Sequence, residues 1–181
     1  MSMEYAVLDF LQTIHTKFLD AIMVFITSLG DAGILWIFIA LILLVTKKYR
    51  KYGMIIAASL LLGLLIGNIL LKNLVGRERP FASREDIELL IHAPRDFSFP
   101  SCHTLSSFAA AGSIYYMNKR WGLAALIIAA LIGLSRLYLY VHFVTDVLAG
   151  MLIGLLIAYA MTKVAAVKFH VFPLDHERKV L

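Results

Sequence analysis

The sequence predicts an all-α protein, a bundle of five to six helices that cross a membrane. The chain has 181 residues, of which 61% are hydrophobic, and its mean hydropathy is +0.83. Soluble domains contain about 45–50% apolar residues. Five or six helices of about 20 residues would use most of this length. No linker rich in Ser, Pro or Gly divides the chain, so we expect one domain over residues 1–181.

The N-terminal residues predict a helix that lies along the membrane surface. Within residues 4–15, Tyr5, Leu8 and Leu11 recur at helical spacing and polar residues fill the other positions. This pattern is typical of an interfacial amphipathic helix. The apolar run at 18–29 is short for a span, since a helix rises about 1.5 Å per residue. It is either half-inserted or a kinked continuation into the next helix.

Longer apolar runs predict the spanning helices. We expect these helices at residues 32–46, 53–72, 103–117, 121–138 and 143–163. Two of them contain a GxxxG pattern, at residues 63–67 and 150–154. Such a pattern can form a dimer face, but close packing within the bundle is the favoured interpretation. The oligomeric state stays open.

The charges predict how the helices are oriented. The net charge is +5, yet the basic residues cluster between apolar runs, which indicates topology rather than nucleic-acid binding. The turns at 47–51 and 119–120 are purely basic, whereas charges nearly balance in 73–102. The positive-inside rule therefore places the basic turns in the cytoplasm and the 73–102 loop on the extracytoplasmic face of the cell membrane. The same rule places the basic C-terminal tail on the cytoplasmic side; its basic residues are Lys163, Lys168, Arg178 and Lys179.

Polar residues interrupt the apolar sequence in three stretches, at 72–80, 100–103 and 135–146. Charged groups at the edge of hydrocarbon are costly and are generally retained for function. Lysine and arginine suit a phosphate, which accepts several charge-assisted hydrogen bonds at once. Two histidines add a nucleophile or base and an acid. The pattern predicts phosphoryl chemistry at a membrane surface.

His142 and Asp146 are four residues apart, so they share one face of the predicted last helix. An aspartate that accepts the Nδ1 proton would fix the tautomer and leave Nε2 free to attack. The alternative is a histidine satisfied at a helix end. Arg136, six residues earlier, and the second histidine, His103, favour the catalytic interpretation.

Lys72 and Arg79 are candidate phosphate ligands. Lys72 ends an apolar helix, where a lysine can also extend to the interface without further function. Arg79 precedes Pro80, which disfavours helix at the preceding residue and helps to fix the turn. Arg77 is interpreted as a solvated loop charge.

Pro100 and Ser101 predict the start of another helix, whose exposed N–H groups can bind an anion. His103 in that turn could protonate a leaving oxygen. Cys102 is a less favoured nucleophile, because Phe108 stands six residues later, where cysteine phosphatases carry an arginine that cradles the phosphate. Cys102 is therefore interpreted as a small residue in a tight turn.

These stretches resemble the type 2 phosphatidic acid phosphatase (PAP2) superfamily of membrane lipid phosphatases. The family pattern is Lys-x6-Arg-Pro, then Pro-Ser-Gly-His, then Ser-Arg-x5-His-x3-Asp. The chain matches it with Lys72 to Pro80, Pro100 to His103, and Ser135 to Asp146. The resemblance covers about residues 18–165, the expected core. Cys102 replaces the family glycine, at a cost of about 1 kcal/mol if that position needs φ > 0 or a close approach to phosphate.

The resemblance implies a role for each site residue. His142 would attack phosphorus and become phosphohistidine, oriented by Asp146, and His103 would protonate the leaving group and then activate water. Phosphoryl oxygens would be held by side chains and backbone N–H groups. The phosphate-binding set is Lys72, Arg79, Ser101, Cys102 and Arg136.

No metal or other cofactor is implied, and the sequence has neither a carboxylate cluster suited to magnesium nor a His/Cys set suited to zinc. The expected substrate is a membrane lipid phosphate or diphosphate. Undecaprenyl diphosphate is slightly favoured over phosphatidylglycerophosphate, and phosphatidic acid is a further possibility. A lipid phosphotransferase and a non-catalytic anion-binding membrane protein are the alternatives from other classes.

Overall fold

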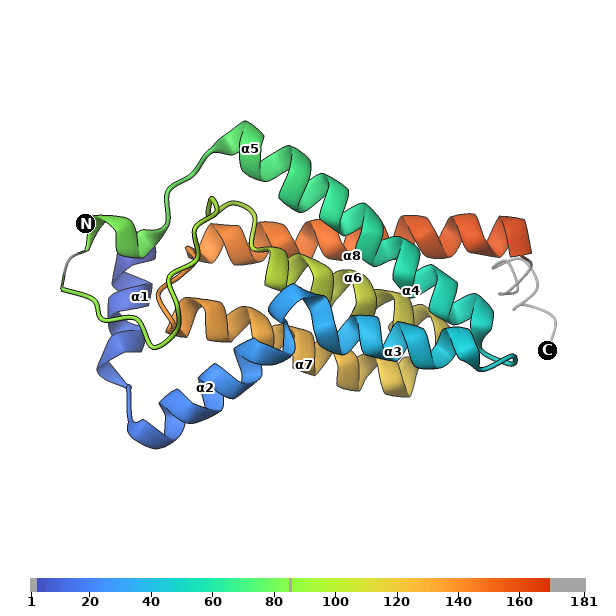
Figure 1. Ribbon diagram of the computed structural model, residues 1–181, viewed down its shortest axis with the longest axis horizontal. Coiled ribbons are helices and arrows are strands. Elements are labelled where there is room, and N and C mark those ends of the chain that lie inside the picture. Colours follow the sequence, from blue (N-terminus) through green and yellow to red (C-terminus); the bar gives the residue numbers. More distant parts are fainter. Residues whose placement is uncertain (1–2, 85, 170–181) are drawn as a thin grey trace.

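The structure is a computed structural model that describes residues 3–84 and 86–169, and helices dominate this part of the chain (Figure 1). Within the described residues no segment forms a strand, which confirms the all-α prediction. The elements in chain order are α1 (Met3–Thr13), α2 (Lys17–Leu29), η1 (Asp31–Gly33), α3 (Ile34–Val45), α4 (Arg50–Gly63), the π-helical η2 (Leu64–Leu71), α5 (Lys72–Val75), η3 (Pro80–Ser83), α6 (Cys102–Met117), α7 (Lys119–Tyr138) and α8 (Val144–Phe169).

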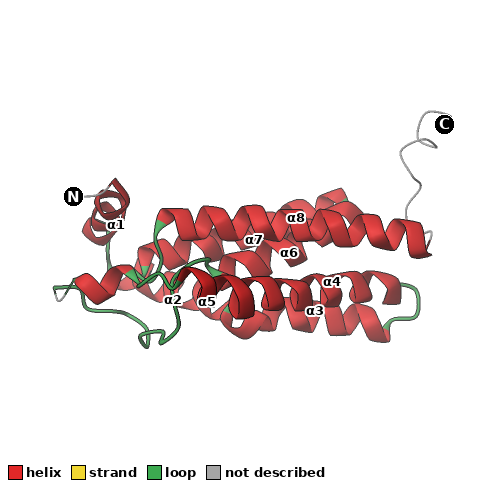
Figure 2. Ribbon diagram, turned by 90° about the horizontal axis from the view of Figure 1, so that it is seen from above, coloured by secondary structure: helices red, strands yellow, loops and turns green. Residues whose placement is uncertain are grey.

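Helix α6 forms the centre of the bundle and packs against α8, α7 and α4 (Figure 2). Glycines allow the close approach: a Cβ at Gly150 or Gly154 would lie 2.6 Å from Ser101 O or 2.5 Å from Leu105 O. On the α4–η2 side, a Cβ at Gly63 or Gly67 would lie within 2.8 Å of Leu105 side-chain atoms. Both GxxxG patterns therefore pack within the bundle, as the favoured interpretation predicted.

Helices α2 and α3 form one bent pair. Their axes differ by 45° across a short break, in which Ala32 and Gly33 have φ of 50° and 70°. The left-handed backbone of these two residues redirects the chain. Both interpretations of residues 18–29 stay predictions, because a bent pair of this kind is either a broken span or a re-entrant loop.

The protein is a multi-pass membrane protein by the length and apolarity of its helices. Three described segments are long and apolar enough to cross a membrane: Arg50–Ser83, Lys119–Tyr138 and Val144–Val167. The bent α2–α3 pair gives a fourth if it counts as one span. Helix α6 has only 16 residues. Five to six spans are therefore not established by these lengths.

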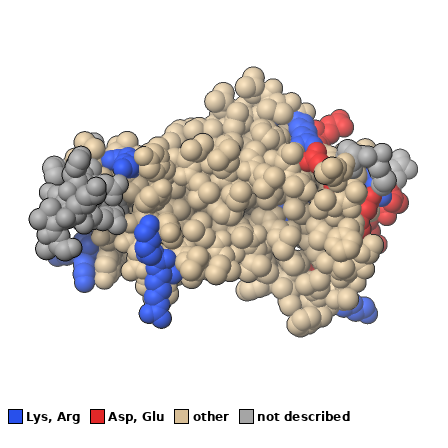
Figure 3. Space-filling view, turned by 180° about the vertical axis from the view of Figure 1, so that it is seen from behind, with Lys and Arg blue, Asp and Glu red and all other residues tan. Residues whose placement is uncertain are grey.

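Two ends of the bundle differ in charge. Figure 3 shows Lys and Arg alone toward one end, and Asp and Glu beside Lys and Arg toward the other. The α3–α4 turn lies at one end of the molecule, whereas α1 and the loop after α5 lie at the opposite end (Figure 1). The expected tail residues Arg178 and Lys179 lie outside the described residues.

Candidate active site

A polar cavity of about 420 Å³ lies at the end of the bundle that carries α1. Its wall includes six of the eight predicted site residues, which are Lys72, Arg79, Cys102, His103, Arg136 and His142. Ser101 and Asp146 are buried and do not line it. The segments that meet here are far apart in the sequence, and the bundle brings them together.

His142 lies in the turn between α7 and α8 and is only 1% exposed. Its Nδ1 is 3.5 Å from Asp146 Oδ2, and the Ser98 hydroxyl lies between the two side chains. Ser98 Oγ donates to Asp146 Oδ2 at 2.5 Å and lies 3.3 Å from His142 Nδ1. Sequence patterns gave no signal for Ser98.

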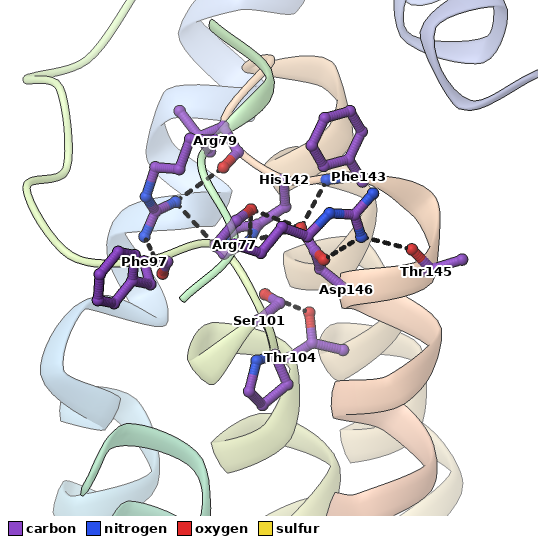
Figure 4. A network of polar contacts seen from close by, with 12 residues as sticks. Arg77, Arg79, Phe97, Ser101, Thr104, His142, Phe143, Thr145 and Asp146 are labelled. Atoms are coloured by element: carbon purple, nitrogen blue, oxygen red, sulfur yellow. Dashed lines mark hydrogen bonds and ion pairs between the residues drawn. The ribbon is translucent and has the colours of Figure 1, made fainter. Parts of the chain in front are cut away.

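The contact of His142 Nε2 with Arg79 determines the tautomer of His142. Arg79 Nη1 lies 3.1 Å from His142 Nε2 (Figure 4). A guanidinium can only donate, so Nε2 accepts and Nδ1 carries the proton. Burial lowers the pKa of His142 well below its usual range, and the charges of Arg79 and Arg136 lower it further, against the effect of Asp146. A neutral ring with its Nε2 lone pair toward the cations is the form that a nucleophile needs.

Three cations surround the cavity, and each is nearly buried: Lys72 is 4% exposed, Arg79 6% and Arg136 2%. Arg136 Nη1 donates to Thr27 Oγ1 at 2.6 Å, but its buried Nε has no hydrogen-bond partner among the described residues. A buried donor without a partner is rare in folded proteins. This arrangement suits an anion that accepts from Arg136.

Asp96 forms ion pairs with two of these cations. Its carboxylate bonds to Lys72 Nζ and accepts from Arg79 Nη2 at 2.7 Å. Burial raises the pKa of Asp96, but the hydrogen bonds and charges of Lys72 and Arg79 lower it to about 2. The sequence analysis counted Asp96 only among the balanced charges of its loop.

His103 has a partner that the sequence analysis also missed. Its Nε2 is 2.8 Å from Asp31 Oδ1, at the break between α2 and α3. A carboxylate at this position stabilises the protonated ring that a general acid requires. The available signal was an aspartate inside an otherwise apolar run, because such charges are costly at membrane depth.

The interpretation of Arg77 as a solvated loop charge is wrong. Its Nη1 donates to Asp146 Oδ1 at 2.7 Å, and its Nη2 donates to Glu4 Oε2 at the same distance. Gly76, with φ of 61°, ends α5 and turns the chain back toward the start of α8. That turn brings the guanidinium to a buried carboxylate instead of to solvent.

Of the two conditions under which Cys102 would be costly, a positive φ is absent. Cys102 begins α6, and the described non-glycine residues with positive φ are Ala32 and Tyr140. Its sulfur lies 3.5 Å from the position of a Cβ on Gly67 and contacts Pro100 O at 3.7 Å. The side chain thus fits beside a glycine of η2, and it lines the cavity as the close-approach alternative requires.

A second cavity, of about 360 Å³, adjoins the polar one and shares Asp96, Cys102 and His103 with it. Apolar side chains of α3, α4 and η2 dominate the rest of its wall, among them Ile37, Leu60, Leu61 and Leu64. Within the described residues, no group of three or more His, Cys, Asp or Glu could hold a metal ion.

Comparison with known proteins identifies the family. The PAP2 superfamily profile matches residues 52–169. Undecaprenyl-diphosphatase of Sulfolobus acidocaldarius is 31% identical over 147 residues, which cover 81% of this chain and 70% of that protein. Undecaprenyl-diphosphatase BcrC of Bacillus subtilis is 31% identical, covering 80% and 74%. Phosphatidylglycerophosphatase B of the same species is 35% identical, covering 81% and 75%.

Solved structures agree. The transmembrane PAP2 type phosphatidylglycerolphosphate phosphatase of Bacillus subtilis superposes with a TM-score of 0.78 at 28% identity, over 91% of this chain and 85% of that one. Aquifex aeolicus LpxE gives 0.79 at 25% identity, over 90% and 96%. The order of the three polar stretches, the cavity that they form and these matches lead to one conclusion. The chain belongs to the PAP2 superfamily.

Proposed function

We propose that the protein removes the terminal phosphate of a membrane lipid phosphate or diphosphate through a phosphohistidine at His142. The observation that carries this proposal is the geometry of His142. Its Nε2 meets Arg79 at the wall of a cavity with three cations, while its Nδ1 side is held by Ser98 and Asp146. A positioned, neutral nucleophile beside preorganised positive charge is the arrangement that phosphoryl transfer requires.

The reaction then has two steps. In the first, Nε2 of His142 forms a bond to phosphorus, the bond from phosphorus to the lipid oxygen breaks, and His103 gives its proton to the leaving oxygen. In the second, His103 takes a proton from water, the water oxygen bonds to phosphorus, and the P–N bond breaks to release inorganic phosphate. Asp31, 2.8 Å from His103 Nε2, supports the protonated ring before the first step and again after the second.

Lys72, Arg79 and Arg136 neutralise the phosphoryl oxygens, with N–H groups from the first turn of α6 beside Cys102. Ser101 is buried behind the cavity wall, and its hydroxyl accepts from Thr104 Oγ1 at 2.9 Å, so we give it no direct contact with the phosphate. The phosphate replaces the Asp96 carboxylate on Lys72 and Arg79.

The adjoining apolar cavity supports a lipid substrate. It meets the polar cavity at His103, where the leaving oxygen would lie, so the lipid chain can run between α3 and α4. Among candidates we favour undecaprenyl diphosphate, since two relatives are undecaprenyl-diphosphatases. Phosphatidylglycerophosphate is the second candidate. One relative is a phosphatidylglycerophosphatase, and one similar solved structure is of a phosphatidylglycerolphosphate phosphatase.

The placement in the membrane follows from charge and apolar surface. We place the cavity on the extracytoplasmic face, because the positive-inside rule favours the cytoplasmic side for the basic turns at 47–51 and 119–120. Helix α6 then acts as a fifth, short span. Helix α1 lies in the interface, with its exposed apolar side chains Met3, Val7 and Phe10 toward lipid.

The test is phosphate release by the purified protein across undecaprenyl diphosphate, phosphatidylglycerophosphate and phosphatidic acid, with and without EDTA. We expect release that survives chelation and is lost in His142→Gln. A phosphotransferase would instead require an added acceptor for turnover. No release from any lipid, or equal release by His142→Gln, contradicts the proposal.

A further inference from the structure

The carboxylate of Asp146 is completely buried, and each of its oxygens is held by hydrogen bonds. Oδ2 accepts from Ser98 Oγ and from the Phe143 N–H at 2.9 Å. Oδ1 accepts from Arg77 Nη1 at 2.7 Å. Apart from His142, Arg77 is the one cation within ion-pair distance of this carboxylate among the described residues. A buried charge of this kind is stable only when it is paired and hydrogen-bonded.

Arg77 is itself fixed on several sides (Figure 4). Its guanidinium lies over the Phe143 ring, 3.9 Å from the centroid, and Nη1 also donates to Thr145 Oγ1 at 2.7 Å. The Ser98 N–H donates to the Arg77 carbonyl at 2.7 Å, so the two groups that hold Asp146 are tied through the backbone. Arg77 does not line either cavity. Its contacts therefore serve Asp146 rather than a ligand.

Glu4 of α1 completes this arrangement. Its Oε2 accepts from Arg77 Nη2 at 2.7 Å, and its Oε1 accepts from Thr145 N at 3.0 Å and Thr145 Oγ1 at 2.7 Å. Thr145 N is one of the first N–H groups of α8, which have no partner within the helix. Burial raises the pKa of Glu4, but hydrogen bonds from Thr145 and Arg77 lower it more, so the net shift is downward. Glu4 thus stays charged and holds both Arg77 and the helix end that carries Asp146.

We propose that Arg77 and Glu4 are positioning residues for the His142–Asp146 pair. The N-terminal helix α1 therefore contributes, through Glu4, to the geometry of the active site. This inference rests on the proposed function, in which Asp146 orients His142. Arg77 sets the position and charge of Asp146, and Glu4 sets the position of Arg77. Neither residue touches the phosphate.

A matched control exists on the same face of the molecule. Arg84 also joins the loop to a carboxylate of α1, with its Nη1 3.2 Å from Asp9 Oδ2, and it bonds to Asp86 as well. Neither of these carboxylates contacts the catalytic histidines. Helix α1 has further anchors, such as Tyr5 OH at 2.6 Å from Ser83 Oγ and the fully buried Leu8, so loss of Glu4 alone leaves it docked.

The experiment compares Arg77→Ala, Arg77→Lys, Glu4→Gln and Arg84→Ala in the full-length protein, with undecaprenyl diphosphate and phosphatidic acid in detergent. We expect Arg77→Ala to lower kcat about 10- to 100-fold. Loss of a residue that orients the ligand of a metal ion lowers the activity of metalloenzymes by a similar factor. KM should change by less than about threefold, because Arg77 does not face the phosphate. Glu4→Gln and Arg77→Lys should fall between Arg77→Ala and the wild type, and Arg84→Ala should keep the wild-type kcat.

The pH dependence of kcat distinguishes a positioning role from a purely structural one. Arg79 and Arg136 face His142, and Asp96 and His103 share its cavity, but all four are unchanged in these variants. Without the Arg77 charge the pair binds a proton more readily, so the acid limb of kcat should shift to higher pH in Arg77→Ala and not in Arg84→Ala. If Arg77→Ala fails to fold, Arg77→Lys and Glu4→Gln decide by the same comparison.

Equal kcat and equal acid limbs in the Arg77, Glu4 and Arg84 variants, per folded protein, would overturn the inference. Failure of the proposed function looks different, since the wild type would then release no phosphate or His142→Ala would stay active. An active wild type with an inactive His142→Ala and a normal Arg77→Ala removes the positioning role alone.

Discussion

Gly30 offers the sharpest test of how His103 is positioned. It lies at the end of α2 with φ of −90° and ψ of −10°, a backbone that alanine adopts without strain. A Cβ there would lie 2.8 Å from His103 Cδ2 and 2.9 Å from Ile132 Cγ2. Glycine is therefore required by the approach of the histidine and not by the backbone. Gly30→Ala should displace the ring of the proposed general acid.

The size of the effect follows from these distances. Carbon atoms in contact are separated by about 3.5–4.0 Å, so the ring must move by about 0.7 Å or more. A movement of this size along the contact with Asp31 lengthens it from 2.8 Å past the limit of about 3.2 Å for a hydrogen bond. A displacement of about 1 Å can cost 10²-fold in rate. We expect kcat to fall about 10- to 100-fold, with a smaller change in KM.

The assay is phosphate release at saturating lipid, normalised to monodisperse protein. Gly112→Ala is the matched control, because its Cβ would lie 2.7 Å from Ala158 Cβ in the bundle interior. That variant should lose stability and keep its activity per folded molecule. The double variant with His103→Ala should lose little more than His103→Ala alone, since the two changes act on one group. A wild-type kcat in Gly30→Ala would refute this placement of His103.

The remaining predictions address the nucleophile, Asp96, Cys102 and topology. His142→Ala should abolish phosphate release and His103→Ala should lower it about 10²–10⁴-fold, as loss of a general acid does; an active His142→Ala would exclude it as nucleophile. Asp96→Asn should make inorganic phosphate a stronger inhibitor, because Lys72 and Arg79 lose a competing anion; with its pKa lowered to about 2, Asp96 stays ionised above that pH, so the ratio of the inhibition constants of wild type and variant should not vary between pH 5 and pH 8, and equal inhibition of the two would contradict the competition. Cys102→Gly should keep activity and Cys102→Leu should reduce it, since the side chain sits between Gly67 and the cavity, and equal activity of the two would show that it is not crowded. In a Cys102→Ala background, a cysteine at Glu88 should react with an impermeant thiol reagent outside intact cells and one at Lys119 only after permeabilisation; the reverse labelling contradicts the extracytoplasmic site.

Helical periodicity predicted the helices approximately, and the polar interruptions together with the family resemblance predicted six residues of the cavity wall. The predicted helix at 53–72 is interrupted by the π-helical segment Leu64–Leu71, which an apolar run cannot indicate. In that segment Gly67 faces Cys102 and Leu105 of α6. Tertiary packing, rather than local preference, therefore decides the winding next to Lys72.

Partners of the site residues were harder to predict than the residues themselves. Asp31, Ser98 and Asp96 each contact a predicted residue from a distant part of the chain. Such contacts depend on how the loops cross the end of the bundle. An aspartate in an apolar run was a usable signal for Asp31, whereas Ser98 and Asp96 lie in a polar loop where similar residues are common.

The pairing of Arg77 with Asp146 follows from the extended backbone beside it. The segment between Gly76 and Pro80 is not helical, and Arg79 has extended backbone angles, φ of −83° and ψ of 152°. Alternate residues of an extended segment share a side. Since Arg79 faces His142, Arg77 must face the same turn, where Asp146 follows one helical turn later. The two arginines thus hold the pair from both ends, one at the attacking nitrogen and one at the carboxylate.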